Sequence, residues 1–261
     1  MSKKSILLII DMQNDFALPE GKLSVPNAMD DVKRLATFIR RKAEMIDEII
    51  LTQDSHQPYS IANPSFWIDS KGNHPAPFTN ITPDDIRTGK YRAAKEDMQS
   101  WSTIYIEELT KQGEYPHVIW PEHCIAGTKG EAIVDTLIDQ IQEWSREGRS
   151  YTLLRKGESP LVEHFGAIRA NIEIEDDKRT QTNKPLIDRL NQAETIYIAG
   201  EAKSHCVANT IKQILQFEHL AKKLVILDDC MSDVSGFEGF GKPIFQAAQQ
   251  AGALVTLSTE I

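Results

Sequence analysis

The sequence has few cysteines and no long apolar run. Its 261 residues include three cysteines, Cys124, Cys206 and Cys230, an odd number without paired spacing. This pattern argues against a disulfide framework and for a reducing compartment. No apolar stretch approaches the roughly 20 residues of a membrane-spanning helix. The first apolar run ends early, at Asp11, and no signal-cleavage pattern follows it, so we expect a cytoplasmic protein.

Positive charge is also scarce. The chain carries 29 Lys and Arg residues against 38 Asp and Glu residues, a net charge of −9, and has no basic run. Such a chain is a poor candidate for binding nucleic acid or an anionic membrane, so we expect a small-molecule ligand. Hydrophobic residues make up 41% of the chain, enough for a substantial core, and the length suits one large α/β domain.

Short runs rich in Ile, Val and Leu recur along the chain, and most are separated by helical patterns. Continuous apolar runs suit strands that are buried on both faces, as in a parallel sheet. We expect strands near residues 5–10, 48–52, 118–120, 151–154, 195–199, 224–227 and 253–257, and helices near 28–44, 131–147, 185–193 and 206–219. The alternation predicts a three-layer α-β-α fold with a doubly wound, mainly parallel sheet of about six strands.

One region interrupts this alternation. Residues 67–115 contain turn-rich segments and no convincing strand, followed by a predicted helix near 102–111. A connection of this length within a compact domain is usually functional. We therefore interpret residues 1–261 as a single domain with an inserted lid or interface region at about 67–115, which leaves room for a homo-oligomer.

Cys206 is the most informative cysteine. It lies in residues 200–207, Gly-Glu-Ala-Lys-Ser-His-Cys-Val, between a predicted strand and a predicted helix. The positive end of a helix dipole favours the thiolate and would make this residue a nucleophile. Cysteine is equally common as a small, buried and inert hydrophobic residue. The segment alone leaves both interpretations open with about equal weight.

Two further polar residues follow predicted strands in the same way, Asp11 and Lys156. The carboxyl ends of parallel strands share one edge of the sheet, where ligands bind. A thiol, a carboxylate and an amine at that edge fit covalent hydrolysis, in which Asp11 takes the thiol proton and later activates water. Lys156 would stabilise the thiolate, and backbone N–H groups would bind the oxyanion. Taken singly, Asp11 could instead cap a helix and Lys156 could be a solvated lysine.

Asp54, His56 and His123 form a second polar group at the strand ends. An Asp-x-His pair with a distant His is a nitrogen and oxygen ligand set that suits Zn²⁺, Fe²⁺ or Mn²⁺. Each histidine could also be an ordinary hydrogen-bonded residue. The shared position at the edge that holds Cys206 favours the metal site.

Five motifs, in order, resemble those of the isochorismatase-like cysteine hydrolases. They are residues 8–16 (Leu-Ile-Ile-Asp-Met-Gln-Asn-Asp-Phe), 52–56 (Thr-Gln-Asp-Ser-His), 120–130 (beginning Trp-Pro-Glu-His-Cys), 156–157 (Lys-Gly) and 200–207. The resemblance spans nearly the whole chain apart from residues 67–115. The Trp-Pro-x-His-Cys and Asp-x-His segments are similar to those of the metal-bearing nicotinamidase branch.

The resemblance implies a metal-assisted amidase that hydrolyses nicotinamide to nicotinate and ammonia through a thioester on Cys206, a reaction of NAD salvage. It implies zinc, with Fe²⁺ or Mn²⁺ as alternatives. It also implies a cis peptide between Glu201 and Ala202, which would aim the N–H groups of Ala202 and Cys206 at the oxyanion. Phe16 matches a family position that packs against the substrate ring. We place Trp67 beside it because it follows Ser65-Phe66.

The chain departs from the family pattern near the predicted metal. Many nicotinamidases have a second His where this sequence has Asn63, and residues 67–115 are atypical of compact members. These departures leave a second hypothesis, the same chemistry on another small amide or ureide. A third hypothesis is a non-catalytic binding protein on the same scaffold.

Overall fold

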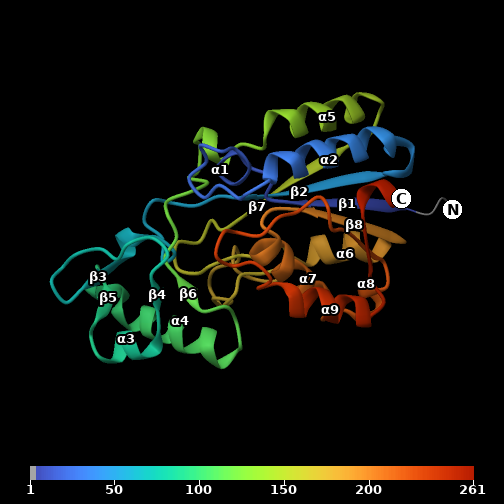
Figure 1. Ribbon diagram of the computed structural model, residues 1–261. Helices are drawn as coiled ribbons and strands as arrows, with labels where there is room; N and C mark the ends of the chain where they lie inside the picture. The colour runs from blue at the N-terminus through green and yellow to red at the C-terminus, as the bar shows by residue number, and fades with distance from the viewer. Residues whose placement is uncertain (1–3) are drawn as a thin grey trace.

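The computed structural model describes residues 4–261 and contains a central six-stranded sheet (Figure 1). Every pair of neighbouring strands in this sheet is parallel. In sheet order the strands are β10 (Leu254–Thr256), β9 (Leu224–Leu227), β8 (Thr195–Gly200), β1 (Ser5–Ile10), β2 (Glu48–Asp54) and β7 (Tyr151–Lys156). The predicted fold class is confirmed, because six of the predicted apolar runs form this sheet.

The seventh run was misassigned. Residues 118–120 do not join the central sheet: His117–Val118 forms β6, which pairs antiparallel with β4 (Asn80–Ile81). Proline occupies positions 116 and 121 on either side of the run. Since proline lacks a backbone N–H, a run bounded in this way is too short for a central strand.

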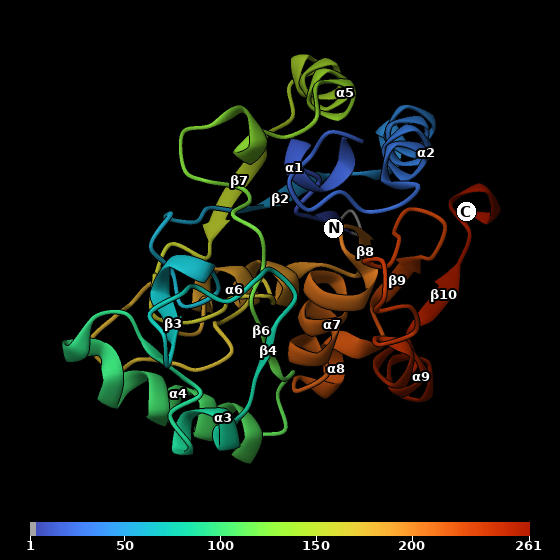
Figure 2. The ribbon, with the colours of Figure 1, turned by 60° about the vertical axis from the view of Figure 1, so that its left-hand side comes forward.

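Helices cover both faces of the sheet (Figure 2). One face packs against α2 (Ala28–Arg41) and α5 (Asp135–Arg146), with the short α1 (Asn14–Ala17) beside them. The other packs against α6 (Lys184–Gln192), α7 (Ala208–Ile214), α8 (Glu218–Ala221) and α9 (Lys242–Gln250). Strand β1 alternates between the two cores, with Leu7 and Ile9 in one and Ile6, Leu8 and Ile10 in the other. Within residues 4–261 no helix is long and apolar enough to cross a membrane.

The inserted region has a small core of its own at the carboxyl end of the sheet (Figure 1). It contains β3 (Trp67–Asp69), β4, α3 (Pro83–Arg87), β5 (Tyr91–Ala93) and α4 (Gln99–Lys111). The helix was predicted, whereas the short antiparallel pairs were not. Strands of two or three residues leave too little periodic pattern to recognise.

Glu201, at the end of β8, is a fully buried acid without a cationic partner among the described residues. Burial and the nearby Asp31 carboxylate raise the pKa of Glu201 well above its usual 4.5. Above pH 4.5 the folded protein therefore keeps a proton on Glu201 that the unfolded chain releases. The contribution of Glu201 to the free energy of unfolding is fully present below the pKa of this residue in the unfolded chain. It falls as the pH rises above that pKa, by up to about 1.4 kcal/mol per pH unit.

Replacing Glu201 by glutamine should therefore increase the free energy of unfolding more at pH 8 than at pH 5, because the amide has no proton to lose. Urea unfolding at the two pH values measures this difference. The exposed Glu20→Gln is the matched control and should change neither value. An equal effect of Glu201→Gln at both pH values would contradict the assignment.

Candidate active site

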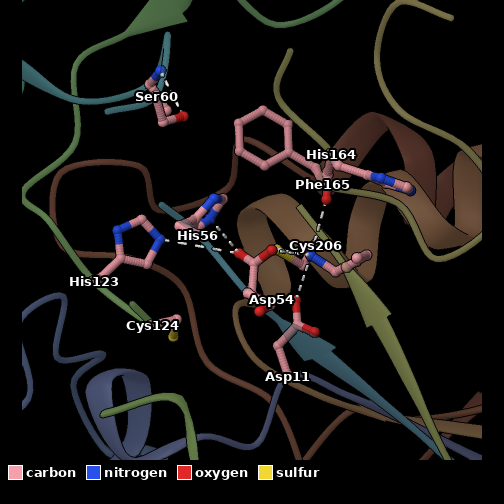
Figure 3. Close-up of polar contacts among 12 residues, drawn as sticks. Asp11, Asp54, His56, Ser60, His123, Cys124, His164, Phe165 and Cys206 are labelled. Atoms are coloured by element: carbon pink, nitrogen blue, oxygen red, sulfur yellow. Dashed lines mark hydrogen bonds and ion pairs between the residues drawn. The ribbon is translucent and has the colours of Figure 1, made fainter. Parts of the chain in front are cut away.

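The predicted catalytic residues converge at the carboxyl edge of the sheet (Figure 3). Asp11 follows β1, Asp54 ends β2 and Lys156 ends β7, and these three strands are neighbours. Cys206 lies after β8 in a π-helical turn, Lys203–Val207, that leads into α7. The sequence predicted one continuous helix over 206–219. The structure breaks it into this turn and two short helices.

Lys156 is the centre of the arrangement. Its Nζ lies 2.8 Å from Asp11 Oδ2, 3.1 Å from Asp54 Oδ1 and 3.7 Å from Cys206 Sγ, and it donates to the carbonyl of His164 at 2.9 Å. Burial would lower the pKa of Lys156, but the carboxylates of Asp11 and Asp54 raise it well above its usual value. The amine is therefore a buried ammonium ion that balances two carboxylates.

The state of the Cys206 thiol differs from the expectation. The helix-dipole argument favoured a thiolate, but burial raises the pKa of Cys206 well above its usual range, and Lys156 only partly opposes this. The side chain is 5% exposed and the carboxylates of Asp11 and Asp54 lie nearby, within 4.8 Å. A preformed thiolate is therefore disfavoured, and the thiol needs a base.

Asp11 is placed to be that base. Burial raises the pKa of Asp11, while the Lys156 ammonium lowers it, and the net direction is upward. A carboxylate with a raised pKa is a stronger base. Thr52 Oγ1 donates a 2.6 Å hydrogen bond to Asp11 Oδ1 and so fixes the carboxylate. A proton can thus pass from the Cys206 thiol to the Asp11 carboxylate, so no thiolate has to be present beforehand.

Asp54, His56 and His123 also come together. Their ligand atoms all lie within 4.8 Å of one another, and all three side chains are buried. His56 Nε2 is 3.0 Å from Asp54 Oδ2, and His123 Nε2 is 4.0 Å from the same oxygen. Burial alone would raise the pKa of Asp54, but His56 and Lys156 lower it, so the carboxylate is ionised. One anionic oxygen and two imidazole nitrogens fit a divalent metal.

His123 is oriented as a ligand would be. Its Nδ1–H donates to the carbonyl of Pro121 at 2.8 Å, which leaves Nε2 facing Asp54. Burial and the neighbouring His56 lower the pKa of His123 to about 4, so the ring is neutral at pH 7. A backbone carbonyl on the second ring nitrogen is a common way to orient a metal-binding histidine. The donor set therefore fits a metal in chemistry and orientation.

Asn63, the predicted departure from the family pattern, is buried. Its Nδ2 donates to the carbonyls of Gln57 and Pro58 at 3.1 and 3.2 Å, while Oδ1 has no hydrogen-bond partner in the described part of the chain. The side chain therefore closes the loop that follows His56.

A small pocket opens above Cys206. Its volume is about 20 Å³, so a planar ring enters only if the aromatic side chains at its wall move apart. Phe16 lines it and contacts the ring of His123 edge-on at 5.3 Å. Six lining residues were not proposed from the sequence: Leu23, Trp120, Glu163, Phe165, His205 and Val234.

Glu163 is the least expected of these lining residues. It is buried, and burial raises its pKa to about 7 even though His56 lowers it. It lies in a long connection without regular secondary structure, so no periodic pattern marks it. Trp120 and His205 lie within two of the recognised motifs, 120–130 and 200–207, and this was the signal that could have found them.

The predicted position of Trp67 was wrong. Trp67 does not line the pocket. It is fully buried in the core of the inserted region, packs against Phe66 and His117 at 5.2 and 5.5 Å between ring centroids, and donates from Nε1 to the carbonyl of Ile61 at 2.7 Å. Strand β3 turns its side chain inward to this core, which the position after Ser65-Phe66 could not reveal.

Trp67→Phe should therefore reduce stability and leave KM for the substrate unchanged. The variant removes the Trp67 Nε1–H donor, so the Ile61 carbonyl keeps only His117 Nε2 at 3.0 Å, and the loss of one hydrogen bond costs about 0.5–1.5 kcal/mol. Thermal unfolding together with steady-state kinetics measures both effects. An increase in KM without loss of stability would instead indicate that Trp67 contacts the substrate.

The backbone after β8 provides the proposed oxyanion donor. The peptide between Glu201 and Ala202 is cis, as the family resemblance implied. The N–H of Ala202, which lies against the pocket, has no backbone or side-chain acceptor within residues 4–261. An unpaired N–H beside a nucleophile can bind an oxyanion.

Comparison with known proteins supports the resemblance. No protein-family model matches the chain. A curated nicotinamidase from Saccharomyces cerevisiae is 25% identical over 224 residues, 85% of each chain. One from Acinetobacter baylyi is 26% identical over 231 residues, 88% of this chain and 83% of that protein.

Solved structures agree on the fold. The yeast nicotinamidase bound to the inhibitor nicotinaldehyde superposes with a TM-score of 0.67, with 20% identity over 97% of this chain and 99% of that one. A Pyrococcus horikoshii pyrazinamidase in complex with zinc has a TM-score of 0.57, with 19% identity and the same coverage. In sequence and in fold, this chain is similar to the nicotinamidase branch of the isochorismatase-like cysteine hydrolases.

Proposed function

We propose that the protein is a cysteine-dependent, metal-assisted amidase that hydrolyses nicotinamide to nicotinate and ammonia. The observation that carries the proposal is the position of the Lys156 ammonium, which contacts Asp11, Asp54 and Cys206 together. It links the nucleophile, its base and the candidate metal ligands within one buried site. The similarity to curated nicotinamidases supports the choice of amide.

The first half-reaction forms a thioester. As Cys206 Sγ attacks the carboxamide carbon, its proton moves to Asp11, and the carbonyl oxygen becomes an oxyanion that the N–H groups of Ala202 and Cys206 bind. Asp11 then gives this proton to the departing nitrogen. The carbon–nitrogen bond breaks, ammonia leaves and the acyl group remains on sulfur.

The second half-reaction releases the acid. Asp11, ionised again, takes a proton from water as its oxygen attacks the thioester carbon. The carbon–sulfur bond breaks, nicotinate leaves, and the proton on Asp11 returns to Cys206. Throughout both steps the Lys156 ammonium stabilises whichever of Asp11 and Cys206 carries the negative charge.

Asp54, His56 and His123 would hold a divalent metal, and we propose zinc. Two imidazoles and a carboxylate suit Zn²⁺, and the pyrazinamidase with a similar fold was solved with zinc. When bound, the metal supplies a Lewis-acidic position for the pyridine nitrogen of the substrate. Phe16, which contacts His123, would pack against the substrate ring.

The inserted region contributes to the wall beside the nucleophile. Tyr115 donates from its hydroxyl to the Ser204 carbonyl at 3.0 Å and contacts the His205 ring at 5.4 Å, while Phe78 contacts Trp120 edge-on at 6.0 Å. We propose that residues 67–115 shape the mouth of the pocket within one domain of residues 1–261.

The direct test is release of ammonia from nicotinamide by the purified protein with its metal intact, followed by identification of nicotinate. A panel of other small amides and ureides in the same assay would show whether nicotinamide is preferred. Absence of ammonia from nicotinamide in protein that contains metal would refute the proposal.

Removal of the metal should abolish the activity reversibly. We expect a chelator to eliminate ammonia release, Zn²⁺ to restore it, and metal analysis to find about one ion per chain, as for a single site of three protein ligands. His123→Ala should lose metal and lower activity by more than the about 10–100-fold typical of outer-shell changes. The exposed His219→Ala is the matched control and should retain both. Full activity in metal-free protein would contradict the assignment.

A further inference from the structure

A second and larger cavity lies beside the active site. Its volume is about 300 Å³, within the range of small-molecule sites, and it shares no lining residue with the pocket at Cys206. It reaches Thr52 and Lys156, the two residues that hold the Asp11 carboxylate. It is bounded elsewhere by the connection between β7 and α6 and by the start of α6.

The cavity concentrates positive charge on an acidic protein. Lys178 and Arg179 line it and are exposed, against one lining carboxylate, Glu158, whereas the Arg155 side chain points to the other face of β7, toward Glu131. Arg179 pairs with Asp177, but Lys178 forms no ion pair within residues 4–261, and Arg155 reaches Glu131 only at 3.8 Å. Lys178 is therefore available to a ligand, and the exposed Arg179 can contact a ligand as well as Asp177, although the chain as a whole has a net charge of −9.

A buried donor is also available. His164 lines the cavity and is 9% exposed, and its Nε2 is buried without any hydrogen-bond partner in the described chain. Figure 3 shows its imidazole directed away from Asp54, His56 and His123, so it does not serve the metal cluster. A buried unpaired ring nitrogen costs free energy unless a ligand or water satisfies it.

We propose that this cavity is a second binding site, for a small molecule that carries a phosphate group. Arginine and lysine side chains together with neutral polar donors are the groups that recognise phosphate. Asn183 caps α6 beside the cavity, so the positive end of that helix dipole adds to the attraction. The ligand would contact His164, whose carbonyl holds Lys156, and so would lie directly behind the catalytic ammonium.

The site can be tested by calorimetric titration of the full-length protein, with its metal, using inorganic phosphate, ADP and adenosine. We expect phosphate or ADP to bind and adenosine not to bind. Tighter binding of ADP would identify a nucleotide as the ligand, and binding of phosphate alone would identify the free anion. The readout is binding, so it does not depend on whether the protein hydrolyses nicotinamide.

A double variant locates the binding. Lys178→Ala with Arg179→Ala should weaken binding by about tenfold or more, because each removes a charged partner of the phosphate. Arg87→Ala with Lys111→Ala removes the same charges from exposed positions outside the cavity and should leave the affinity unchanged. The proposal is overturned if neither anion binds at millimolar concentration, or if the first double variant binds as tightly as the unaltered protein, since the anion would then be held elsewhere, such as at the metal.

Discussion

Replacing Cys206 by alanine is expected to lower nicotinamide hydrolysis by about 10⁴-fold or more, the scale seen when a covalent nucleophile is removed. Cys206 is the cysteine that lines the pocket and lies 3.7 Å from Lys156 Nζ, whereas Cys124 and Cys230 are not among the lining residues. The loss should fall on kcat, since the variant keeps Phe16 and the three proposed metal ligands. Steady-state ammonia release measures it.

The metal content of Cys206→Ala should be unchanged, because Asp54, His56 and His123 remain in place. Cys230→Ala is the matched control: its thiol is also buried, lies in the core beside α2, and should tolerate the change without loss of turnover. Mass spectrometry of the unaltered protein quenched during turnover should show an acyl adduct on Cys206. Retained activity in Cys206→Ala would mean that the nucleophile is another residue.

The convergence of Asp11, Asp54 and Lys156 could be predicted because it depends on two regular features. Continuous apolar runs identify strands that are buried on both faces, and the carboxyl ends of parallel strands share an edge. The residue that follows each run is therefore placed by topology alone. The proximity of these three residues could therefore be predicted without a known structure. The structure places Lys156 Nζ within 3.1 Å of both carboxylates.

Glu163 and Trp67 could not be placed in the same way. Glu163 lies between Lys156 and Lys184, where the described chain forms neither helix nor strand, so no periodicity indicates which side chains turn inward. Trp67 lies on a strand of three residues, and its direction depends on the separate core of the inserted region. In both segments the side-chain direction is set by tertiary packing, which local sequence does not encode.

The protonation of Cys206 illustrates the same limit for electrostatics. The strand-to-helix turn predicted a thiolate from the dipole alone, an effect of about 0.3–1 kcal/mol at an exposed position. Burial and the carboxylates of Asp11 and Asp54 act in the opposite direction and outweigh it. These contributions depend on neighbours in three dimensions, so the sequence indicated Cys206 as the candidate nucleophile and could not establish its charge.

Lys156→Met should produce the other large effect, on both activity and stability. The methionine keeps most of the volume but removes the ammonium that lies 2.8 Å from Asp11 and 3.1 Å from Asp54. Asp11 would then lose its ion-pair partner and Asp54 would keep only His56 at 3.0 Å, and breaking a buried pair in this way costs about 3–5 kcal/mol. Turnover should fall by about 10²–10³-fold or more, the scale of losing one preorganised charge-stabilising group.

Chemical denaturation and ammonia release, measured on the same preparation, separate the two effects of Lys156→Met. Lys90→Met provides the matched control, because Lys90 forms a 2.7 Å pair with Asp85 but is 60% exposed. An exposed pair contributes at most about 1 kcal/mol, so this variant should keep nearly full stability and full activity. Equal losses of stability and activity in the two variants would contradict this assignment. They would show that removing any lysine has the same effect, whether or not it lies between Asp11, Asp54 and Cys206. We expect the losses to differ because Lys156 is the cation that all three catalytic-site groups share.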